Sequence, residues 1–316
     1  MTSEKRPPAI LSLTMPFYPI SSSYDRRKLY PMENRALMER YVAALRREMQ
    51  GAAPDYEEFE IQALHVGGGI AGHAADEALG ELLRDLRGWF HFAEDAQILL
   101  NVHPGMVSTE TLLACTRGKV NWLSVDYATA DPFESEAMGR FLPPSAMDTT
   151  MMVLADAPLR LSFDVLVGLP GQSEGSLRST LDKALAYGAG RVVLHKLELV
   201  PGTVFAERDS VQYRDSASPR KHLPDEQACE GLYQYAAGYL RQKVFRATAP
   251  GCYTLAGVAS PYDELREQKC PQIGFGLGSV TRMDGIVAQN TLDMDTYLRY
   301  SAMPEKITAS VRPAQE

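Results

Sequence analysis

The sequence predicts an α/β protein built from repeated strand–helix units. Short apolar runs, typical of buried strands, alternate with longer segments whose apolar residues recur at helical spacing. Such alternation implies parallel strands joined by right-handed crossovers. With 316 residues, the chain is long enough for one large α/β domain or for a barrel with an appendage.

Six strand–helix units follow one another along the chain. The first helix has Tyr41 and Leu45 on its apolar face, and Gly88 is expected to end the second. Ser145 and Asp148 form a capping-box pattern that opens the fourth helix. Strands are expected at residues 9–15, 61–66, 97–102, 120–125, 159–167 and 191–199, and helices at 32–50, 77–88, 108–118, from 145 onward, 173–188 and 225–243.

The C-terminal part of the chain follows a different pattern. The sixth helix is delayed by a loop at 201–224, and the sequence from about Ala249 reads as irregular segments with a last helix near 293–301. We therefore expect two parts, residues 1–205 as the strand–helix body and residues 206–316 as a C-terminal helix with a lid or sheet extension. Six units fit either an open doubly wound sheet or an incomplete (β/α) barrel, and periodicity does not choose between them.

Composition restricts the function classes. The net charge of −8 argues against nucleic-acid binding, which needs clustered Lys and Arg. No apolar run approaches the length of a membrane span, and no signal peptide is recognisable, so we expect a cytoplasmic protein that acts on a small molecule. The six histidines show no metal-binding spacing, and no metal site is expected.

The four cysteines show no C-x-x-C pairing. Cys115 and Cys229 fall on the apolar faces of expected helices, where a free thiol behaves as a small hydrophobe. Cys252 and Cys270 lie in loop-like sequence without a neighbouring group that would activate them. A disulfide framework is not expected.

Unusual residues cluster where the expected strands end. In parallel α/β folds, ligands bind at that edge, so we place the site there. The residues concerned are Tyr18 to Asp25 after the first strand, Gly67, Gly68 and Gly69 after the second, Asn101 and His103 at the third, Asp126 and Tyr127 at the fourth, and Asp164 with the sequence GLPGQ at the fifth.

Each of these features also has a purely structural interpretation. The glycines at 67–69 expose backbone polar groups to a ligand, or simply form a tight turn. Asp164 either accepts hydrogen bonds from ribose hydroxyls or is a structurally paired carboxylate. Arg140 suits a ligand carboxylate, although a surface Arg is commoner. His65 near the edge is a candidate base, and a packed, hydrogen-bonded His is its alternative, as it is for His195.

Eight segments together resemble one family in their order and spacing. The chain is similar, from about Ile10 to Lys243, to radical S-adenosylmethionine enzymes of the anaerobic coproporphyrinogen III oxidase group, which includes heme chaperones. The resemblance implies an incomplete (β/α)6 TIM-like barrel with S-adenosylmethionine across the strand ends and a C-terminal α/β extension. The segments are MPFY, VGGGIAG, NVHPGMVS, LSVDYATAD, MGRF, FDVLVGLPGQS, LELVPGTVF and LPDEQA.

The loop after the first strand departs from the family. In the family it carries C-x-x-x-C-x-x-C, whose thiolates hold a 4Fe–4S cluster, and the matching positions here are Tyr18, Ser22 and Asp25. These are hard oxygen donors, whereas Fe–S clusters need thiolates. No 4Fe–4S cluster is therefore expected, and radical generation from S-adenosylmethionine is not expected either.

Other family positions are partly kept. By resemblance, the glycines at 67–69 bind the methionyl amine, Arg140 meets the methionyl carboxylate and Asp164 lies near the ribose; Asn101 and Leu166 complete the expected cofactor contacts. Asn101 stands where the family has Glu, and Ala128 where it usually has Gln.

Three functions remain open from the sequence. The first is a transferase or cyclase that uses S-adenosylmethionine in polar chemistry, with Tyr18, Asp25 and His65 as catalytic residues. The second is a tetrapyrrole carrier, with His65, His103 or Tyr18 as axial ligand. The third is a non-catalytic partner of an active relative.

Overall fold

The computed structural model describes residues 6–18, 30–32, 34–68, 76–139, 145–198 and 223–314. Within this part of the chain, twelve strands form one mixed sheet, and β2 pairs with β3 outside it. The strands are β1 (Pro8–Thr14), β2 (Phe17–Tyr18), β3 (Tyr30–Pro31), β4 (Glu60–Gly67), β5 (Phe92–Val102), β6 (Trp122–Ala128), β7 (Arg160–Val167), β8 (Ala189–Lys196), β9 (Phe245–Ala249), β10 (Cys252–Leu255), β11 (Gln272–Phe275), β12 (Val280–Met283), β13 (Ile286–Asn290) and β14 (Thr308–Pro313).

The helices lie mainly between successive strands. The first six strand–helix units place α1 after β1, α2 after β4, α3 after β5, α5 after β6, α6 after β7 and α8 after β8. The helices are α1 (Arg35–Ala52), α2 (Asp76–Trp89), α3 (Thr109–Gly118), α4 (Pro132–Ala137), α5 (Ser145–Leu154), α6 (Glu174–Ala186), α8 (Glu226–Gln242), α9 (Pro261–Glu267), α10 (Met294–Tyr300) and α11 (Pro304–Ile307), with a short 3₁₀ helix at Ala53–Tyr56.

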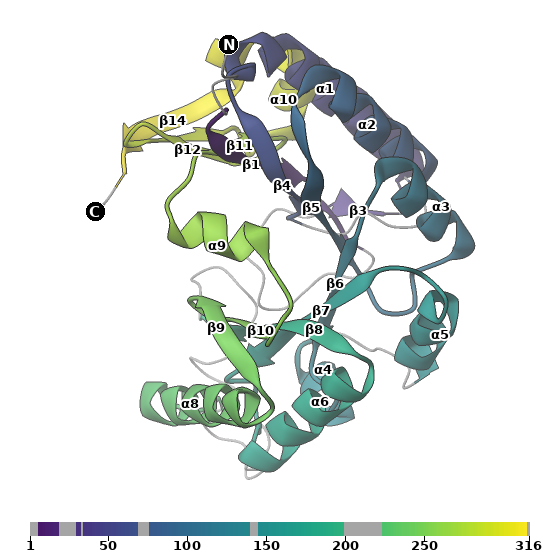
Figure 1. The fold of residues 1–316 in the computed structure, drawn as a ribbon, viewed down its shortest axis with the longest axis vertical. Coiled ribbons are helices and arrows are strands. Elements are labelled where there is room, and N and C mark those ends of the chain that lie inside the picture. Colours follow the sequence, from purple (N-terminus) through teal and green to yellow (C-terminus); the bar gives the residue numbers. More distant parts are fainter. Residues whose placement is uncertain are drawn as a thin grey trace.

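The order of the parallel strands decides between the two architectures left open by the sequence. β1, β4, β5, β6, β7 and β8 are neighbours in chain order, and each pairs in parallel with the next. A doubly wound sheet would reverse its strand order at a switch point. The sheet instead curves into an open arc with the crossover helices on its outer side (Figure 1). An incomplete (β/α)6 barrel is thus confirmed.

The arc does not close on itself among the described residues, because other strands occupy both of its edges. β11 pairs in parallel with β1, and β10 pairs antiparallel with β8. β12, β13 and β14 continue the sheet beyond β11 as antiparallel neighbours. The C-terminal region is therefore a sheet extension at both edges.

The apolar core lies between the outer side of the sheet and the helices. It includes Leu45 and Met49 of α1 and Leu82 of α2, all fully buried, together with alternate residues of the strands. A second, smaller cluster lies on the inner side, where Tyr262 and Leu265 of α9 pack against Ile10 and other inner-side residues. α9 thus packs on the inner side of the arc (Figure 1).

The sequence-based boundaries agree with most of the observed elements. All six predicted strands and all six predicted helices of the strand–helix units are present, with shifts of up to five residues at their ends. Gly88 does not end its helix, because α2 continues to Trp89. The region after Ala249 is more regular than expected, since it contains α9 and the strands β10 to β14. The division at residue 205 stays a prediction, because residues 199–222 lie outside the described part.

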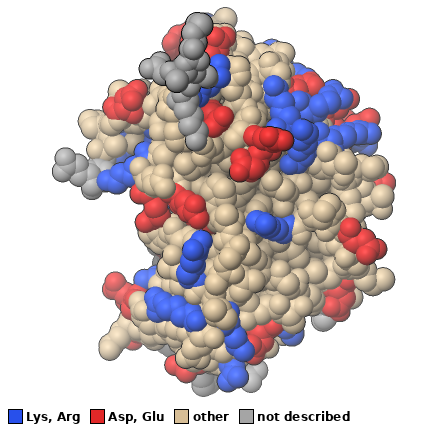
Figure 2. All heavy atoms as spheres, viewed as in Figure 1, with Lys and Arg blue, Asp and Glu red and all other residues tan. Residues whose placement is uncertain are grey.

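The surface carries both signs of charge. On the face shown in Figure 2, Lys and Arg side chains are interspersed with Asp and Glu rather than gathered into one basic surface. Within the described residues, no helix is both long and apolar enough to cross a membrane.

Candidate functional site

Polar side chains line the inner side of the arc towards the carboxyl ends of the strands. Because side chains alternate along a strand, residues two apart face the same side. Asp126 of β6 is the register partner of Asp164 of β7, and Ser162 of β7 is the partner of Arg191 of β8. The hydrogen bonds of Asp164, Ser162 and Arg191, described below, show that these side chains meet inside the arc rather than in the outer core.

His65 is held on both sides of its ring. Its Nε2 lies 3.0 Å from Oδ1 of Asn101 on β5, and its Nδ1 lies 3.2 Å from the hydroxyl of Tyr262 on α9. One tautomer satisfies both contacts, with Nε2–H donating to Asn101 and Nδ1 accepting from Tyr262. Burial lowers the pKa of His65, although the contact with Asn101 acts in the opposite direction. His65 is therefore a neutral imidazole in a fixed orientation.

The two described glycines of the GGG run are required by close packing. A Cβ on Gly67 would lie 2.6 Å from Cε1 and Nε2 of His65 and 3.1 Å from Nδ2 of Asn101. Gly68 has φ +81°, and a Cβ there would lie 2.7 Å from Cγ2 of Thr14. The carbonyl of Gly67 also accepts a hydrogen bond from the backbone N–H of Met15, at 2.7 Å. Both glycines thus bring the end of β4 close to its neighbours.

Asp164 is braced by both adjacent strands. Its Oδ2 accepts a hydrogen bond of 3.0 Å from the hydroxyl of Ser124 on β6, and its Oδ1 lies 3.6 Å from Nε2 of His195 on β8. Burial opposes ionisation, but His195, Arg191 and Ser124 together lower the pKa of Asp164. The carboxylate is ionised, its side chain is 20% exposed, and each oxygen keeps further acceptor capacity for a ligand.

The strand end beside Asp164 is closed by an apolar cluster. Leu166 packs with Ala128, Met138 and Leu169, all buried. Ala128 has φ +59° at the end of β6, a left-handed conformation that is unfavourable for a residue with a Cβ. Leu166 therefore offers an apolar wall next to the carboxylate, and the backbone at the end of β6 is held in a strained conformation.

The GLPGQ turn is fixed by its own glutamine. Oε1 of Gln172 accepts hydrogen bonds from the backbone N–H groups of Gly168, at 2.7 Å, and Leu169, at 3.4 Å. Its Nε2 donates to the carbonyl of Leu166, at 3.0 Å. The turn thus has an architectural role, because it fixes the backbone that follows Asp164.

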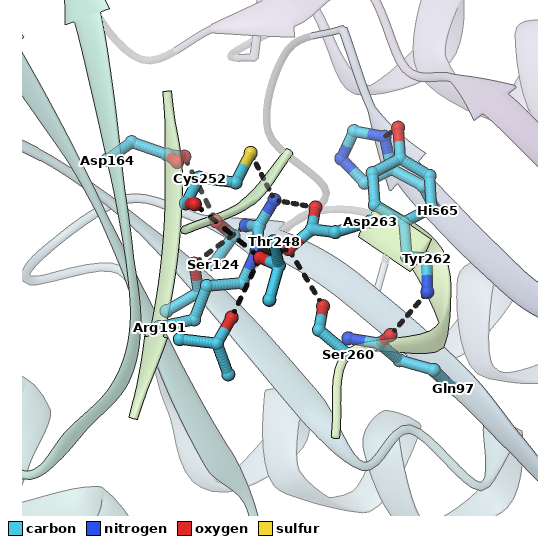
Figure 3. A network of polar contacts seen from close by, with 12 residues as sticks. His65, Gln97, Ser124, Asp164, Arg191, Thr248, Cys252, Ser260, Tyr262 and Asp263 are labelled. Atoms are coloured by element: carbon cyan, nitrogen blue, oxygen red, sulfur yellow. Dashed lines mark hydrogen bonds and ion pairs between the residues drawn. The ribbon is translucent and has the colours of Figure 1, made fainter. Parts of the chain in front are cut away.

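A second polar network lies beneath Asp164 and attaches α9 to the sheet (Figure 3). Arg191 donates through Nε and Nη2 to both oxygens of Asp263, at 2.7 and 2.6 Å, and through Nη1 to Ser162, at 3.0 Å. Ser260 and Thr248 donate to the same carboxylate. The next residue along α9 towards the N-terminus, Tyr262, makes the contact with His65. α9 therefore joins β4 to β8 across the inside of the arc.

The remaining predicted residues divide into two groups. Tyr18 is buried and packs edge-on against the ring of His103, at 6.1 Å between centroids. Ser22, Asp25, Gly69 and Arg140 lie outside the described residues, and their roles stay predictions.

The described donors do not fit a 4Fe–4S cluster. Cys115 is buried in α3, and Cys252 lies 3.4 Å from Nη2 of Arg191, with its pKa raised by burial to about 11. Burial also raises the pKa of Cys229, so the thiols of Cys229 and Cys252 are protonated rather than thiolates. No group of three or more His, Cys, Asp or Glu in the described part of the chain is arranged to hold a metal ion. No reaction step is therefore assigned to a cluster.

Sequence reasoning missed several residues of this region. The sequence gives a structural role for His195 as an alternative to a catalytic one, and it does not single out Ser124, Arg191, Tyr262 or Asp263. The alternation along β8 places Arg191 and His195 on one face, which was the available signal. Nothing in the local sequence indicates that α9 reaches the inside of the arc.

Comparisons with known proteins agree with this fold. No family model matches the chain. The heme chaperone HemW of Escherichia coli is 22% identical over 291 residues, which are 91% of this chain and 74% of that protein. The bovine mitochondrial radical S-adenosyl methionine domain-containing protein 1 is 27% identical over 223 residues, 69% of this chain and 48% of that protein.

A solved structure matches nearly the whole chain. Coproporphyrinogen III oxidase (HemN) of Escherichia coli, a radical SAM enzyme, superposes with a TM-score of 0.81 and 17% identity over 98% of this chain and 73% of that one. The fold is thus that of HemN, and the sequence relatives support the resemblance to this group of the radical SAM superfamily.

Proposed function

We propose that this chain binds S-adenosylmethionine at the strand ends of its open barrel and uses it in polar chemistry, as a transferase or cyclase acting on a small molecule. The observation that carries the proposal is the ionised, braced carboxylate of Asp164, which lies beside the apolar wall of Leu166. A carboxylate next to an apolar surface suits a nucleoside, whose ribose diol donates hydrogen bonds and whose base is flat and apolar on its faces.

The sequence relatives support the choice of ligand. One of them is named for a radical S-adenosyl methionine domain, and the fold match is to a radical SAM enzyme. Within the proposal, Asp164 accepts from the ribose, the backbone at Gly67 and Gly68 lies near the methionyl amine, and Arg140 binds its carboxylate. Asn101 contributes its Nδ2 amide group as a donor, because its contact with His65 uses only Oδ1.

The proposed chemistry needs no metal ligand. The sulfonium of S-adenosylmethionine is an electrophile: the acceptor's nucleophilic atom bonds to the transferred carbon, the carbon–sulfur bond breaks, and sulfur keeps the electron pair. The protein positions the acceptor and takes up its proton. Tyr18 and Asp25 are proposed to line the acceptor side, where the family has its cluster.

His65 is better suited to positioning than to proton transfer. Both of its ring nitrogens are engaged, and its pKa is lowered by burial. A base held in this way must break a hydrogen bond before it accepts a proton. Within the proposal, His65 fixes Asn101 and the Gly67 backbone at the ligand's edge, which revises its expected role as a base.

Calorimetry tests this function. S-adenosylmethionine is titrated into protein purified without added iron, alongside Asp164→Asn. The matched control is Asp156→Asn, which makes the same change at an exposed carboxylate just after α5. We expect binding to the wild type and to the control and at least tenfold weaker binding to Asp164→Asn, because a charge-assisted hydrogen bond is lost. Absence of binding to the wild type would reject the proposal.

A second candidate is a tetrapyrrole carrier, which is favoured by the HemW relatives. The histidine candidates for an axial ligand are poorly placed for it: His65 has both ring nitrogens engaged, and His103 is buried with its Nδ1 2.8 Å from the carbonyl oxygen of Pro104. A hemin titration that gives a Soret band would favour this function. If neither ligand binds, the non-catalytic partner becomes the working model.

A further inference from the structure

His195 is the most exposed titratable side chain of the polar group around Asp164. It lies at the end of β8, directly before Lys196, and its side chain is 53% exposed. Its register partner is Leu166, so it stands beside the apolar wall proposed for the nucleoside. The side chain therefore reaches the open end of the barrel from the strand next to Asp164.

Asp164 lies at ion-pair distance from the imidazole of His195. Nε2 of His195 faces Oδ1 of Asp164 at 3.6 Å, and Ser124 fixes the other carboxylate oxygen. With Nε2 directed at the carboxylate, Nδ1 is the nitrogen that remains for a ligand. A carboxylate at ion-pair distance from one nitrogen stabilises the imidazolium and leaves the other nitrogen available, which is an arrangement suited to acid–base catalysis.

Three charged groups act on this imidazole. Burial and the positive charge of Arg191 lower the pKa of His195, while Asp164 and Asp126 raise it, and the carboxylates prevail. Lys196 does not compete for these carboxylates, because its ammonium group pairs with Glu230 on α8. The pKa of His195 is therefore raised, and the imidazolium that forms when the ring takes up a proton is stabilised.

We propose that His195 is a proton-transfer residue of the strand-end site, oriented by Asp164 and facing the bound S-adenosylmethionine and its acceptor. The inference rests on the proposed function. In the transfer step, the acceptor's nucleophilic atom bonds to the carbon attached to sulfur, and the C–S electron pair goes to sulfur. The acceptor's proton goes to Nδ1 of neutral His195, and Asp164 stabilises the resulting imidazolium.

Site-resolved modification with diethylpyrocarbonate tests the inference, because the reagent attacks neutral imidazole. The rate at each histidine is followed by mass spectrometry across pH, with and without saturating S-adenosylmethionine. His91 is the internal control, since it is exposed and directly precedes β5, at the amino end of that strand, whereas the proposed site lies at the carboxyl ends. The variants are Asp164→Asn and the control Asp156→Asn.

Two results are expected. S-adenosylmethionine slows modification of His195 at least tenfold and leaves His91 unchanged. Asp164→Asn moves the pH midpoint of His195 modification down by about one unit, because an opposite charge is removed, whereas Asp156→Asn leaves the midpoint in place.

The failures of the two proposals are distinguishable. If S-adenosylmethionine binds by calorimetry but does not protect His195, the inference is overturned and the proposed function stands. An unmoved midpoint in Asp164→Asn also overturns it, because Asp164 then does not stabilise the imidazolium of His195. If S-adenosylmethionine does not bind at all, the proposed function fails and the inference falls with it.

Discussion

Arg191 and Asp263 form a two-pronged ion pair inside the barrel, with N–O distances of 2.7 and 2.6 Å. The side chains are 4% and 0% exposed. Ser162, Ser260 and Thr248 complete the hydrogen bonding of the two charges, so neither is left without partners. The pair attaches α9 to β8, and the adjacent Tyr262 attaches the same helix to His65 of β4.

Loss of one member of this pair is expected to be strongly destabilising. Asp263→Ala leaves the guanidinium of Arg191 buried without its counter-charge, and we expect a loss of about 3–5 kcal/mol in the free energy of unfolding. Urea denaturation measures it. Glu264→Ala is the control, because Glu264 pairs with Arg246 at the surface at 3.8 Å and its loss is expected to cost at most about 1 kcal/mol. Equal effects of the two variants would contradict the structural role given to Asp263.

Tyr262→Phe tests the hydrogen bond to His65 while it keeps the packing of the aromatic ring of α9. The variant keeps the ring but removes the hydroxyl that donates to Nδ1 of His65. We expect a loss of about 1–3 kcal/mol, because a buried acceptor is left without its donor. The pKa of His65 is expected to rise, since the neutral imidazole loses a stabilising contact. NMR titration of the His65 ring protons measures the change, and an unchanged pKa would show that the contact does not stabilise the neutral form.

The buried carboxyl group of Glu48, on α1, is expected to make the stability of the fold depend on pH. It is 7% exposed on α1 and accepts hydrogen bonds from Gly276, Asn290 and Tyr297, at 2.9, 2.7 and 2.5 Å. Burial raises its pKa to about 7 despite these donors. The carboxyl group thus joins α1 to three parts of the C-terminal region, namely the end of β11, β13 and α10.

Stability is expected to fall as Glu48 ionises. Because the folded-state pKa lies above the unfolded value of 4.5, the contribution of the protonated group is complete below pH 4.5 and is lost as the pH rises through about 7. The total is on the order of 3 kcal/mol. Glu48→Gln is expected to lose this dependence, measured as unfolding free energy from pH 4 to pH 8. Parallel pH profiles for the variant and the wild type would contradict the assignment.

Gly68→Ala tests the close approach at the end of β4. The substitution places a Cβ at φ +81° and 2.7 Å from Cγ2 of Thr14, so the backbone near the proposed methionyl amine must shift. We expect at least tenfold weaker binding of S-adenosylmethionine in calorimetry. Gly231→Ala in α8 is the matched control, since a Cβ there meets nothing within 4 Å, and a gain of up to about 1 kcal/mol in stability is expected. Unchanged binding in Gly68→Ala would remove this backbone from the site.

The sequence predicted the strand–helix body well because its elements have strong periodicity. The strand of residues 159–167 and the helix after it are examples, with bounds within a few residues of β7 and α6. The placement of the site at the strand ends follows from parallel topology alone, and the polar group around Asp164 lies there. These features depend on local pattern, which one sequence contains.

The features that could not be predicted depend on contacts between distant parts of the chain. β10 has four residues and joins the sheet through β8, more than fifty positions earlier in the sequence. Asp263 looks like an ordinary surface carboxylate of a short helix until its pairing with Arg191 is known. From the sequence, His65 resembles a free base. The fold brings Asn101 and Tyr262 to its two ring nitrogens, and neither contact can be read from the local sequence.

The central claim is that S-adenosylmethionine binds without a cysteine-ligated cluster. In the most direct test, the protein is purified anaerobically, one half of it is treated with iron and sulfide, and unbound metal is removed from both halves. Bound iron and S-adenosylmethionine binding are then measured on the same two samples. We expect equal, stoichiometric binding in both samples, with iron far below the content of a 4Fe–4S cluster. Binding that appears only in the treated sample, in proportion to its iron, would show that S-adenosylmethionine needs a cluster.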